Sequence, residues 1–400
     1  MTRAANAPPG DGGGVPPDLL ERVQRRLTAG GEQVPAAAAV AAAVRAEIRG
    51  LIGDGEVLRL IRSIQQELVG AGPLSALLAD PDTTDVVVNA PDDVRVDRGG
   101  GWERVPICFA DDAAVQRLAR RLAAGADRRL DDAQPWVDAQ LRAGVRLHAV
   151  LAPVAASGSC LSLRVLRPAT LDLAALERRG AFPAAVGTLL RRMLAARLAF
   201  LVTGGTGSGK TTLLGALLGA VEPADRVVIV EDSAELLPNH PHTLRLVCRT
   251  GNVEGSGRIE LRDLVRQALR MRPDRLVVGE VRGPELVDLL VALNTGHRGC
   301  AGTLHANSAA DVPARLVALA GLGGMPEPVL QTQLAPAVQA VVHLQRDVRA
   351  GVVRRAVSEI AVLRRAPTGA VEAITAYDGH GAPGAGADRL EHLLGPAPSC

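Results

Sequence analysis

The sequence predicts an α/β protein in which a smaller α+β domain and a helical segment precede a parallel sheet covered by helices. Three observations predict this class. Apolar runs typical of buried strands alternate with helical stretches after about residue 180. A glycine-rich loop joins one of these strands to a helix. Hydrophobic residues make up 47% of the chain but aromatic residues only 2%, so Ala, Leu and Val must build the core.

Both ends of the chain are rich in Gly, Pro and Ala, so we expect a disordered tail over residues 1–17 and a mostly disordered tail over residues 366–400. Residues 18–70 read as a helical segment. Their apolar positions recur at the three- and four-residue spacing of one helix face, at Leu58, Ile61, Ile64 and Leu68.

Short β-rich runs surround one helical stretch in residues 71–168, which predicts the α+β domain. We expect a linker over residues 169–180. Residues 181–365 then form the domain in which strands and helices alternate. Its strands are expected at Leu198–Thr203, Arg226–Glu231, Arg275–Gly279, Cys300–Leu304 and Ala337–Leu344.

Composition limits the classes of partner. The net charge of +2 provides no overall field toward nucleic acid or anionic lipid. The five cysteines are far apart and form no C-x-x-C pair, which argues against a zinc module or a disulfide framework. The longest uncharged apolar run near the front, Pro35–Val44, is about half the length that crosses a bilayer. We therefore expect a cytoplasmic protein without a transmembrane segment, peripheral to the membrane through partners.

Residues Gly204–Thr211 match the phosphate-loop pattern G-x-x-x-x-G-K-[ST] between a predicted strand and a predicted helix. Lys210 is the only lysine, and every other basic side chain of the 45 is arginine. A slim ammonium reaches between two phosphates where a planar guanidinium does not fit. The pattern predicts ATP and Mg²⁺ as ligands, with the Thr211 hydroxyl on the metal. The expected nucleotide contacts are Gly204, Gly205, Thr206, Gly207, Ser208, Gly209, Lys210, Thr211 and Thr212.

Carboxylates follow two predicted strands. Glu231, Asp232 and Glu235 come at or after the end of one strand, where they can hold Mg²⁺ or orient water. Acidic residues after strands are also common helix caps, which is the alternative. Glu280 closes the next apolar run and is our candidate for polarising the lytic water, the alternative being a surface glutamate.

Two polar residues, His305 and Asn307, follow the strand at Cys300–Leu304. At that position they can sense the γ-phosphate or bridge to a neighbouring subunit. A lone histidine is more often a structural hydrogen-bonding group, so both interpretations stay open.

With these motifs in order, residues 70–363 resemble the type II/type IV secretion ATPase superfamily, and most closely its Tad (Flp) pilus-assembly branch of CpaF-type proteins. The resemblance also rests on Arg249-Thr-Gly-Asn-Val-Glu-Gly and on the run Ala268–Gly283. It implies a RecA-like P-loop NTPase domain for residues 181–365. It also implies that Glu231 to Glu235 form an acidic box, that Glu280 ends the Walker B strand, and that His297 to His305 form a histidine box.

The resemblance further implies a homohexamer that works on an inner-membrane platform protein. In such a ring, Arg146 and Arg164 of the smaller domain reach the nucleotide, and Arg282 is a further candidate whose alternative is an ordinary ion pair.

Four functions are compared. The leading one is an ATP-hydrolysing motor for pilus assembly or protein secretion. A DNA-transfer translocase is the alternative, although the near-neutral charge and scarce aromatics argue against direct nucleic-acid binding. A GTPase switch needs a second lysine for its base-reading motif. A scaffold that cannot hydrolyse ATP is disfavoured by Glu280 and Thr211.

Overall fold

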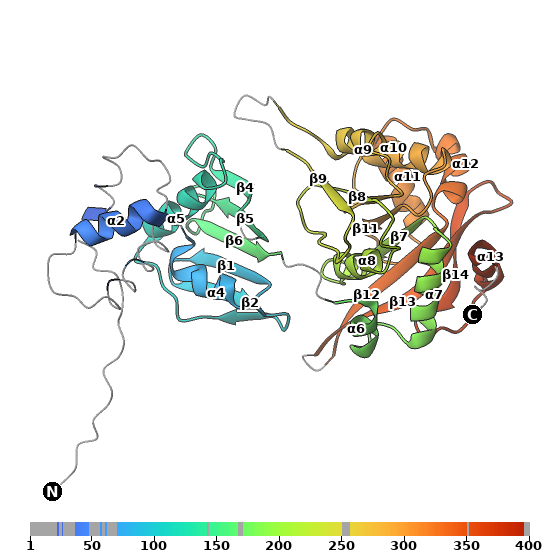
Figure 1. The fold of residues 1–400 in the computed structure, drawn as a ribbon, viewed down its shortest axis with the longest axis horizontal. Helices are drawn as coiled ribbons and strands as arrows, with labels where there is room; N and C mark the ends of the chain where they lie inside the picture. Colours follow the sequence, from blue (N-terminus) through green and yellow to red (C-terminus); the bar gives the residue numbers. More distant parts are fainter. Residues whose placement is uncertain are drawn as a thin grey trace, which may run out of the picture. The chain divides into compact units, whose positions relative to one another are not determined.

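The structure is a computed structural model of the 400-residue chain. It describes residues 22–23, 26, 37–47, 57, 61, 70–141, 144–166, 171–249, 257–349 and 352–395. The chain divides into two compact units, Met1–Leu166 and Arg167–Cys400, and each is described by itself (Figure 1).

Helix α2 (Ala37–Glu47) lies in the segment expected to be helical. Ile61 is helical and buried, whereas the three apolar residues expected beside it, Leu58, Ile64 and Leu68, lie outside the described residues. The expected tail over residues 1–17 also lies outside them. Among the helices that the structure describes, none combines the length and the apolar character needed to span a bilayer.

The first unit contains a six-stranded antiparallel sheet of order β3-β2-β1-β6-β5-β4. Inward side chains alternate with outward ones along the strands, as a half-buried sheet requires. Helix α5 packs on the inner face. The elements are η1 (Gly72–Leu74), α4 (Ser75–Ala79), β1 (Asp85–Ala90), β2 (Asp93–Asp97), β3 (Trp102–Arg104), α5 (Asp112–Ala124), β4 (Trp136–Gln140), β5 (Val145–Val150) and β6 (Cys160–Val165).

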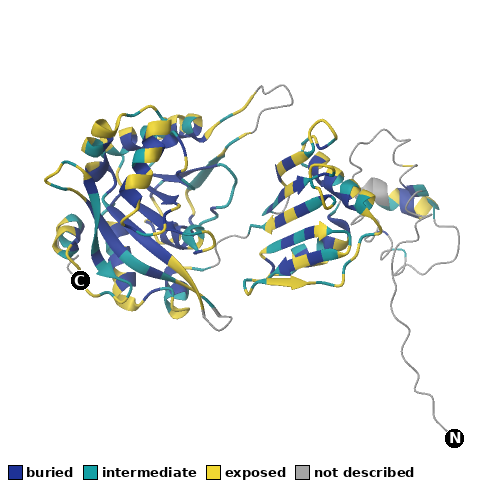
Figure 2. Ribbon diagram, turned by 180° about the vertical axis from the view of Figure 1, so that it is seen from behind, coloured by how far each residue is buried: buried dark blue, intermediate teal, exposed yellow. Residues whose placement is uncertain are grey.

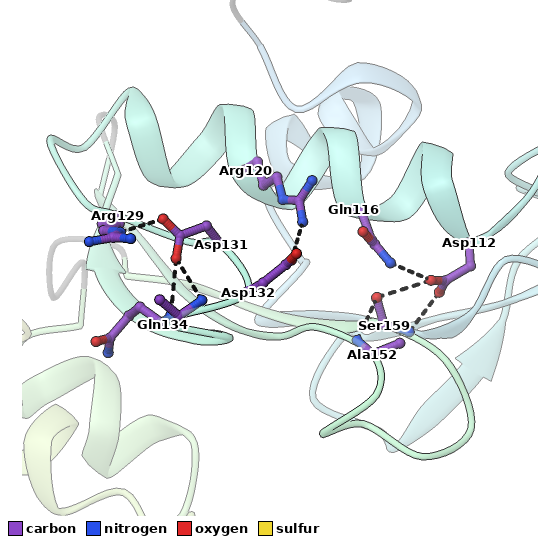
Figure 3. Close-up of polar contacts among 10 residues, drawn as sticks. Asp112, Gln116, Arg120, Arg129, Asp131, Asp132, Gln134, Ala152 and Ser159 are labelled. Atoms are coloured by element: carbon purple, nitrogen blue, oxygen red, sulfur yellow. Dashed lines mark hydrogen bonds and ion pairs between the residues drawn. The ribbon is translucent and has the colours of Figure 1, made fainter.

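Polar contacts fasten α5 to the loop between β5 and β6 (Figure 3). Asp112 accepts hydrogen bonds from the Ser159 backbone N–H at 2.6 Å and from Gln116 at 2.8 Å. The Ser159 hydroxyl, which is fully buried, accepts from the Ala152 N–H at 3.0 Å. Asp112 of the helix and the buried Ser159 of the loop are thus hydrogen-bonded to each other, which joins α5 to this loop.

The second unit is built on an eight-stranded mixed sheet of order β14-β13-β12-β7-β11-β10-β8-β9. The strands from β12 to β9 run parallel, and β13 and β14 continue the sheet antiparallel. The central parallel strands are buried along their whole length (Figure 2). The strands are β7 (Phe200–Gly204), β8 (Val227–Glu231), β9 (Thr243–Val247), β10 (Arg275–Val278), β11 (Ala301–Leu304), β12 (Ala340–Arg349), β13 (Val352–Arg365) and β14 (Val371–Asp378).

Helices cover both faces of this sheet, which gives three layers and two hydrophobic cores. One core lies under α6 (Leu173–Arg178), α7 (Ala184–Ala195), α8 (Lys210–Gly219) and α13 (Ala387–Leu394). The other lies under α9 (Leu261–Leu269), α10 (Glu285–Asn294), α11 (Val312–Leu322) and α12 (Glu327–Ala337). The predicted α/β architecture with a preceding α+β domain is confirmed, except that β13 and β14 make the sheet mixed.

Two segments differ from the expectation. The expected linker contains helix α6, whose Leu173 and Leu176 enter the core and whose N-cap Asp172 accepts from Ala175 N–H at 2.6 Å. The expected C-terminal tail contains β14 and α13. Its helix is held by Glu391, which accepts two hydrogen bonds from Arg192 at 3.1 and 2.7 Å and one from Tyr377 at 2.9 Å. In both segments the burial of apolar side chains stabilises a helix, although the composition is rich in Gly, Pro or Ala.

Candidate nucleotide-binding site

The phosphate loop leaves the buried strand β7 and enters α8 at Lys210. Gly209 caps the helix with φ of +97°, a left-handed conformation that favours glycine. The Lys210 ammonium donates hydrogen bonds to the carbonyls of Gly204 and Gly205, each at 3.0 Å. The loop therefore curls around the ammonium, and the helix N-terminus opens beside it, which is an arrangement that binds anions.

Glu280 acts electrostatically on Lys210. Burial lowers the pKa of Lys210, and the Glu280 charge opposes this by favouring the ammonium form. Glu280 follows β10 and is half-buried. Its turn is fixed by Thr303 of β11, whose hydroxyl donates to the Gly279 carbonyl at 2.6 Å and whose carbonyl accepts from Val281 N–H at 2.8 Å.

Glu231 ends β8 and is only 3% exposed. Its Oε1 accepts hydrogen bonds from the N–H groups of Glu235 at 3.1 Å and Leu236 at 2.7 Å. Its Oε2 is buried and has no partner among the described residues. Burial raises the pKa of Glu231 to about 7, and the two backbone hydrogen bonds only partly offset this. A carboxylate with such a pKa can change protonation state near neutral pH.

The residues present fit a magnesium ion held together with a nucleotide. No group of three or more His, Cys, Asp or Glu side chains in the described part of the chain could hold a metal alone. Mg²⁺ beside phosphates needs only one or two protein oxygens. Thr211 in the first turn of α8 and the unpartnered Glu231 Oε2 are such oxygens. A bound Mg²⁺ would neutralise charge on the phosphates.

Asp232 is engaged elsewhere. Its carboxylate lies 2.6 Å from Arg282, and the Cys248 thiol also hydrogen-bonds it. Burial and the Asp232 charge raise the pKa of that thiol to about 12. The roles of Asp232 in metal binding and of Arg282 in catalysis stay predictions. The ion pair matches the alternative considered for Arg282.

His305 and Asn307 follow β11 and are exposed, on the same edge of the sheet as Glu231 and Glu280. Parallel strands place their carboxyl ends together, so these loops meet beside the phosphate loop. The ring of His297 contacts the end of α10 instead, where its Nδ1 lies 3.3 Å from the Ala292 carbonyl.

Two residues near the loop carried no motif and were missed. His343 of β12 is 1% exposed, and its Nδ1 lies 2.8 Å from Thr203 Oγ1. Arg355 of β13 donates from Nε to the Gly207 carbonyl at 2.8 Å. His343 reaches the loop because β12 pairs with β7, and Arg355 does so because β13 pairs with β12. Both relationships are long-range, so no local sequence pattern identifies these residues.

The two arginines predicted to reach the nucleotide lie in the first unit. Arg146 and Arg164 are opposite each other on β5 and β6, so they share a face of the sheet. Arg146 makes two hydrogen bonds to Asp138, at 3.0 and 2.6 Å, and these hold the pKa of Asp138 below its usual value. Arg164 donates to Asp85 at 3.0 Å. Their reach to a nucleotide stays a prediction.

Residues 67–380 match the family model described as Type II/IV secretion system protein. The chain belongs to this family. A putative conjugal transfer protein of Mycobacterium tuberculosis is 61% identical to this secretion protein over 333 residues, which cover 82% of the chain and 94% of the relative. The type IV secretion system protein PtlH of Bordetella pertussis is 31% identical over 314 residues, covering 70% and 90%.

A crystal structure of the pilus retraction motor PilT with bound ADP has the same fold as this secretion protein. It matches with a TM-score of 0.51 and 22% identity, over 70% of this chain and 78% of that one. The family expected from the sequence motifs is thereby confirmed, as is the fold of an ATPase domain that follows a smaller N-terminal domain.

Proposed function

We propose that this secretion-family protein is an ATP-hydrolysing motor that powers assembly of a Tad (Flp) type pilus or protein secretion. One observation carries the proposal. The only lysine of the chain lies inside a glycine loop, and the charge of Glu280 acts on its ammonium. A cation, a helix N-terminus and a carboxylate together are what hydrolysis of a phosphoanhydride needs.

In this proposal each residue has one task. Lys210 exchanges its two carbonyl partners for β- and γ-phosphate oxygens. Thr211 and Glu231 hold Mg²⁺, and Glu280 orients the attacking water. His305 senses the γ-phosphate from the loop after β11. No covalent intermediate is needed, because positioning and charge stabilisation account for most catalysis of phosphoryl transfer.

The working form that we propose is a cytoplasmic homohexamer bound to an inner-membrane platform protein. Arg146 and Arg164 would act on the nucleotide across the subunit interface, where an arginine stabilises the charge of the transferring phosphoryl group. The register of β5 and β6 places both side chains on the same face of the sheet, and each is hydrogen-bonded to an aspartate.

A DNA-transfer motor is the second candidate, because the relative with 61% identity is named a putative conjugal transfer protein. The net charge of +2 and the 2% aromatic content argue against direct contact with nucleic acid. Stimulation of the ATPase by single-stranded DNA would favour this second function, and its absence would favour the first.

The deciding experiment measures nucleotide binding with a fluorescent ATP analogue, comparing the wild type with Lys210→Ala and Lys210→Arg. We expect both variants to lose binding, since neither offers a slim ammonium to the loop. Competition with ATP and GTP identifies the base. Unchanged binding in Lys210→Ala would overturn the proposal.

A further inference from the structure

The hairpin of β12 and β13 flanks the phosphate loop. Strand β12 pairs with β7 as far as Leu344, which is opposite Gly204, and then continues to Arg349. At Gly204 the chain of β7 turns into the loop, so the last residues of β12 have the loop beside them. A Cβ atom built on Gly204 would lie 2.5 Å from the Leu344 carbonyl oxygen, which shows how closely the two segments approach.

Arg355 of the hairpin makes a polar contact with the loop. Its Nε donates to the Gly207 carbonyl at 2.8 Å. Its aliphatic stem runs along the loop, since a Cβ atom built on Gly209 would lie 3.6 Å from Arg355 Cδ. Arg346, the cross-strand partner of Arg355, brings its Cδ to 3.9 Å from a Cβ built on Gly207.

This contact fixes one peptide unit at both ends. The C=O of Gly207 and the N–H of Ser208 belong to the same planar peptide and point in opposite directions. Arg355 donates to the C=O, while the N–H donates to the Gly205 carbonyl at 3.3 Å. The same Gly205 carbonyl accepts from Lys210 at 3.0 Å. A continuous set of hydrogen bonds therefore leads from Arg355 to the phosphate-binding ammonium.

Arg355 is placed to serve the loop rather than the core. Its side chain is exposed, so the hydrophobic layers of the sheet do not depend on it. Gly207 has a φ of +69° and glycine has few preferences of its own, so the loop needs outside contacts to keep one conformation. A charge-assisted hydrogen bond to a carbonyl supplies such a contact and adds positive potential beside the phosphates.

We propose that Arg355 is a positioning residue that holds the phosphate loop ready for nucleotide. The inference rests on the proposed function, because it concerns the same site. A loop that is already ordered pays less entropy when the ligand binds, so Arg355 acts on affinity. Arg355 takes no part in the chemical step, which in the proposed function depends on Glu280 and the metal ligands.

The experiment compares Arg355→Ala, Arg355→Lys and the neighbouring Arg354→Ala in the full-length protein. Titration with a fluorescent ADP analogue gives the dissociation constant, and steady-state ATPase assays give KM and kcat. For Arg355→Ala we expect about a tenfold higher dissociation constant and KM, with kcat within about twofold of wild type. Arg355→Lys keeps a cationic donor and should recover most of the affinity. Arg354→Ala should behave as wild type.

Two results would overturn the inference: equal affinities of Arg355→Ala and Arg354→Ala, or a loss of kcat at unchanged KM. If the wild type itself binds no nucleotide, the proposed function fails. If the wild type binds, Lys210→Ala does not, and Arg355→Ala binds normally, this inference alone fails. Thermal unfolding without nucleotide checks that each variant is folded, and Arg355→Gln replaces the alanine variant if that one aggregates.

Discussion

Nδ1 of His343 lies 2.8 Å from Oγ1 of Thr203, the next-to-last residue of β7 before the phosphate loop. The His343 ring also hydrogen-bonds the backbone of Asn307, in the loop after β11. One buried ring thus joins the two loops that are expected to surround the phosphates. Because burial lowers the pKa of His343 below its usual 6.5, the ring is neutral at pH 7.

The lowered pKa of His343 predicts a pH-dependent stability. The folded state takes up this proton less readily than the unfolded chain, so the stabilisation is present above pH 6.5 and is lost as the pH falls through the lowered value. We expect the free energy of unfolding to fall more steeply between pH 6.5 and 5 in the wild type than in His343→Gln. Denaturant titrations at several pH values measure this, and equal slopes would contradict it.

The raised pKa of Glu231 predicts that stability depends on pH in the opposite direction. Its folded pKa of about 7 lies above the ordinary 4.5, so the benefit of the neutral form is present below 4.5 and is lost as the pH rises through 7. Glu231→Gln cannot ionise, and its stability relative to the wild type should grow by roughly 3 kcal/mol between pH 4.5 and 8. ATP turnover should fall in the same variant. A pH-independent difference would show that Glu231 is not desolvated.

Gly279 leaves room for Glu231. A Cβ atom built on Gly279 would lie 2.7 Å from Glu231 Cγ, so Gly279→Ala should displace the carboxylate and cost about 1–3 kcal/mol of stability. Adding Glu231→Ala should recover part of that loss. Gly321→Ala is the matched control, since its Cβ would meet nothing within 4 Å. Thermal unfolding compares the wild type, Gly279→Ala, Glu231→Ala, the double variant and the Gly321→Ala control, and simple additivity of the two single variants would refute the contact.

Glu280→Gln should keep ATP binding and lower turnover by about 10² to 10⁴, because the amide cannot accept a proton from water. Single-turnover hydrolysis with a fluorescent nucleotide separates binding from the chemical step. Normal hydrolysis by this variant would transfer the water-orienting role to Glu231, whose glutamine variant serves as the comparison.

Arg164→Ala should leave nucleotide binding largely intact and impair turnover only in the assembled ring. Asp85→Asn is the matched control, because it removes the carboxylate that Arg164 contacts at 3.0 Å and leaves the arginine in place. Equal defects in both variants would mean that the ion pair only supports the fold. ATPase rates measured on separated monomers and oligomers distinguish these outcomes.

The sequence predicted the parts of the fold that local patterns specify. The strands before the phosphate loop and before Glu280 are continuous apolar runs, and the structure has strands at both places. Strand β9 was not predicted, because it is an edge strand whose half-buried side chains are partly polar and form no continuous apolar run. Strand β13 interrupts its Val and Ile residues with Arg, Ala and Glu, which favour helices, so its pairing with β12 and β14 decides that it is a strand.

The candidate site was predictable to a similar extent. Motif residues that follow strands were found, because their spacing reports which edge of the sheet they occupy. His343 and Arg355 were not, since each is joined to the loop or to its preceding strand by a hydrogen bond between residues more than a hundred positions apart in the chain. An ion pair was considered for Arg282, but its partner Asp232 was not predicted, because the two residues lie in loops after two different strands.

The solitary lysine has a practical consequence. Since Lys210 carries the only side-chain amine of the protein, a reagent that acylates amines has a single internal target, and that target lies in the phosphate loop. The labelled fraction, seen as a mass increment in a mass spectrum, would then report loop occupancy without any engineered probe. Ligands that cover the ammonium would be recognised by the protection they give.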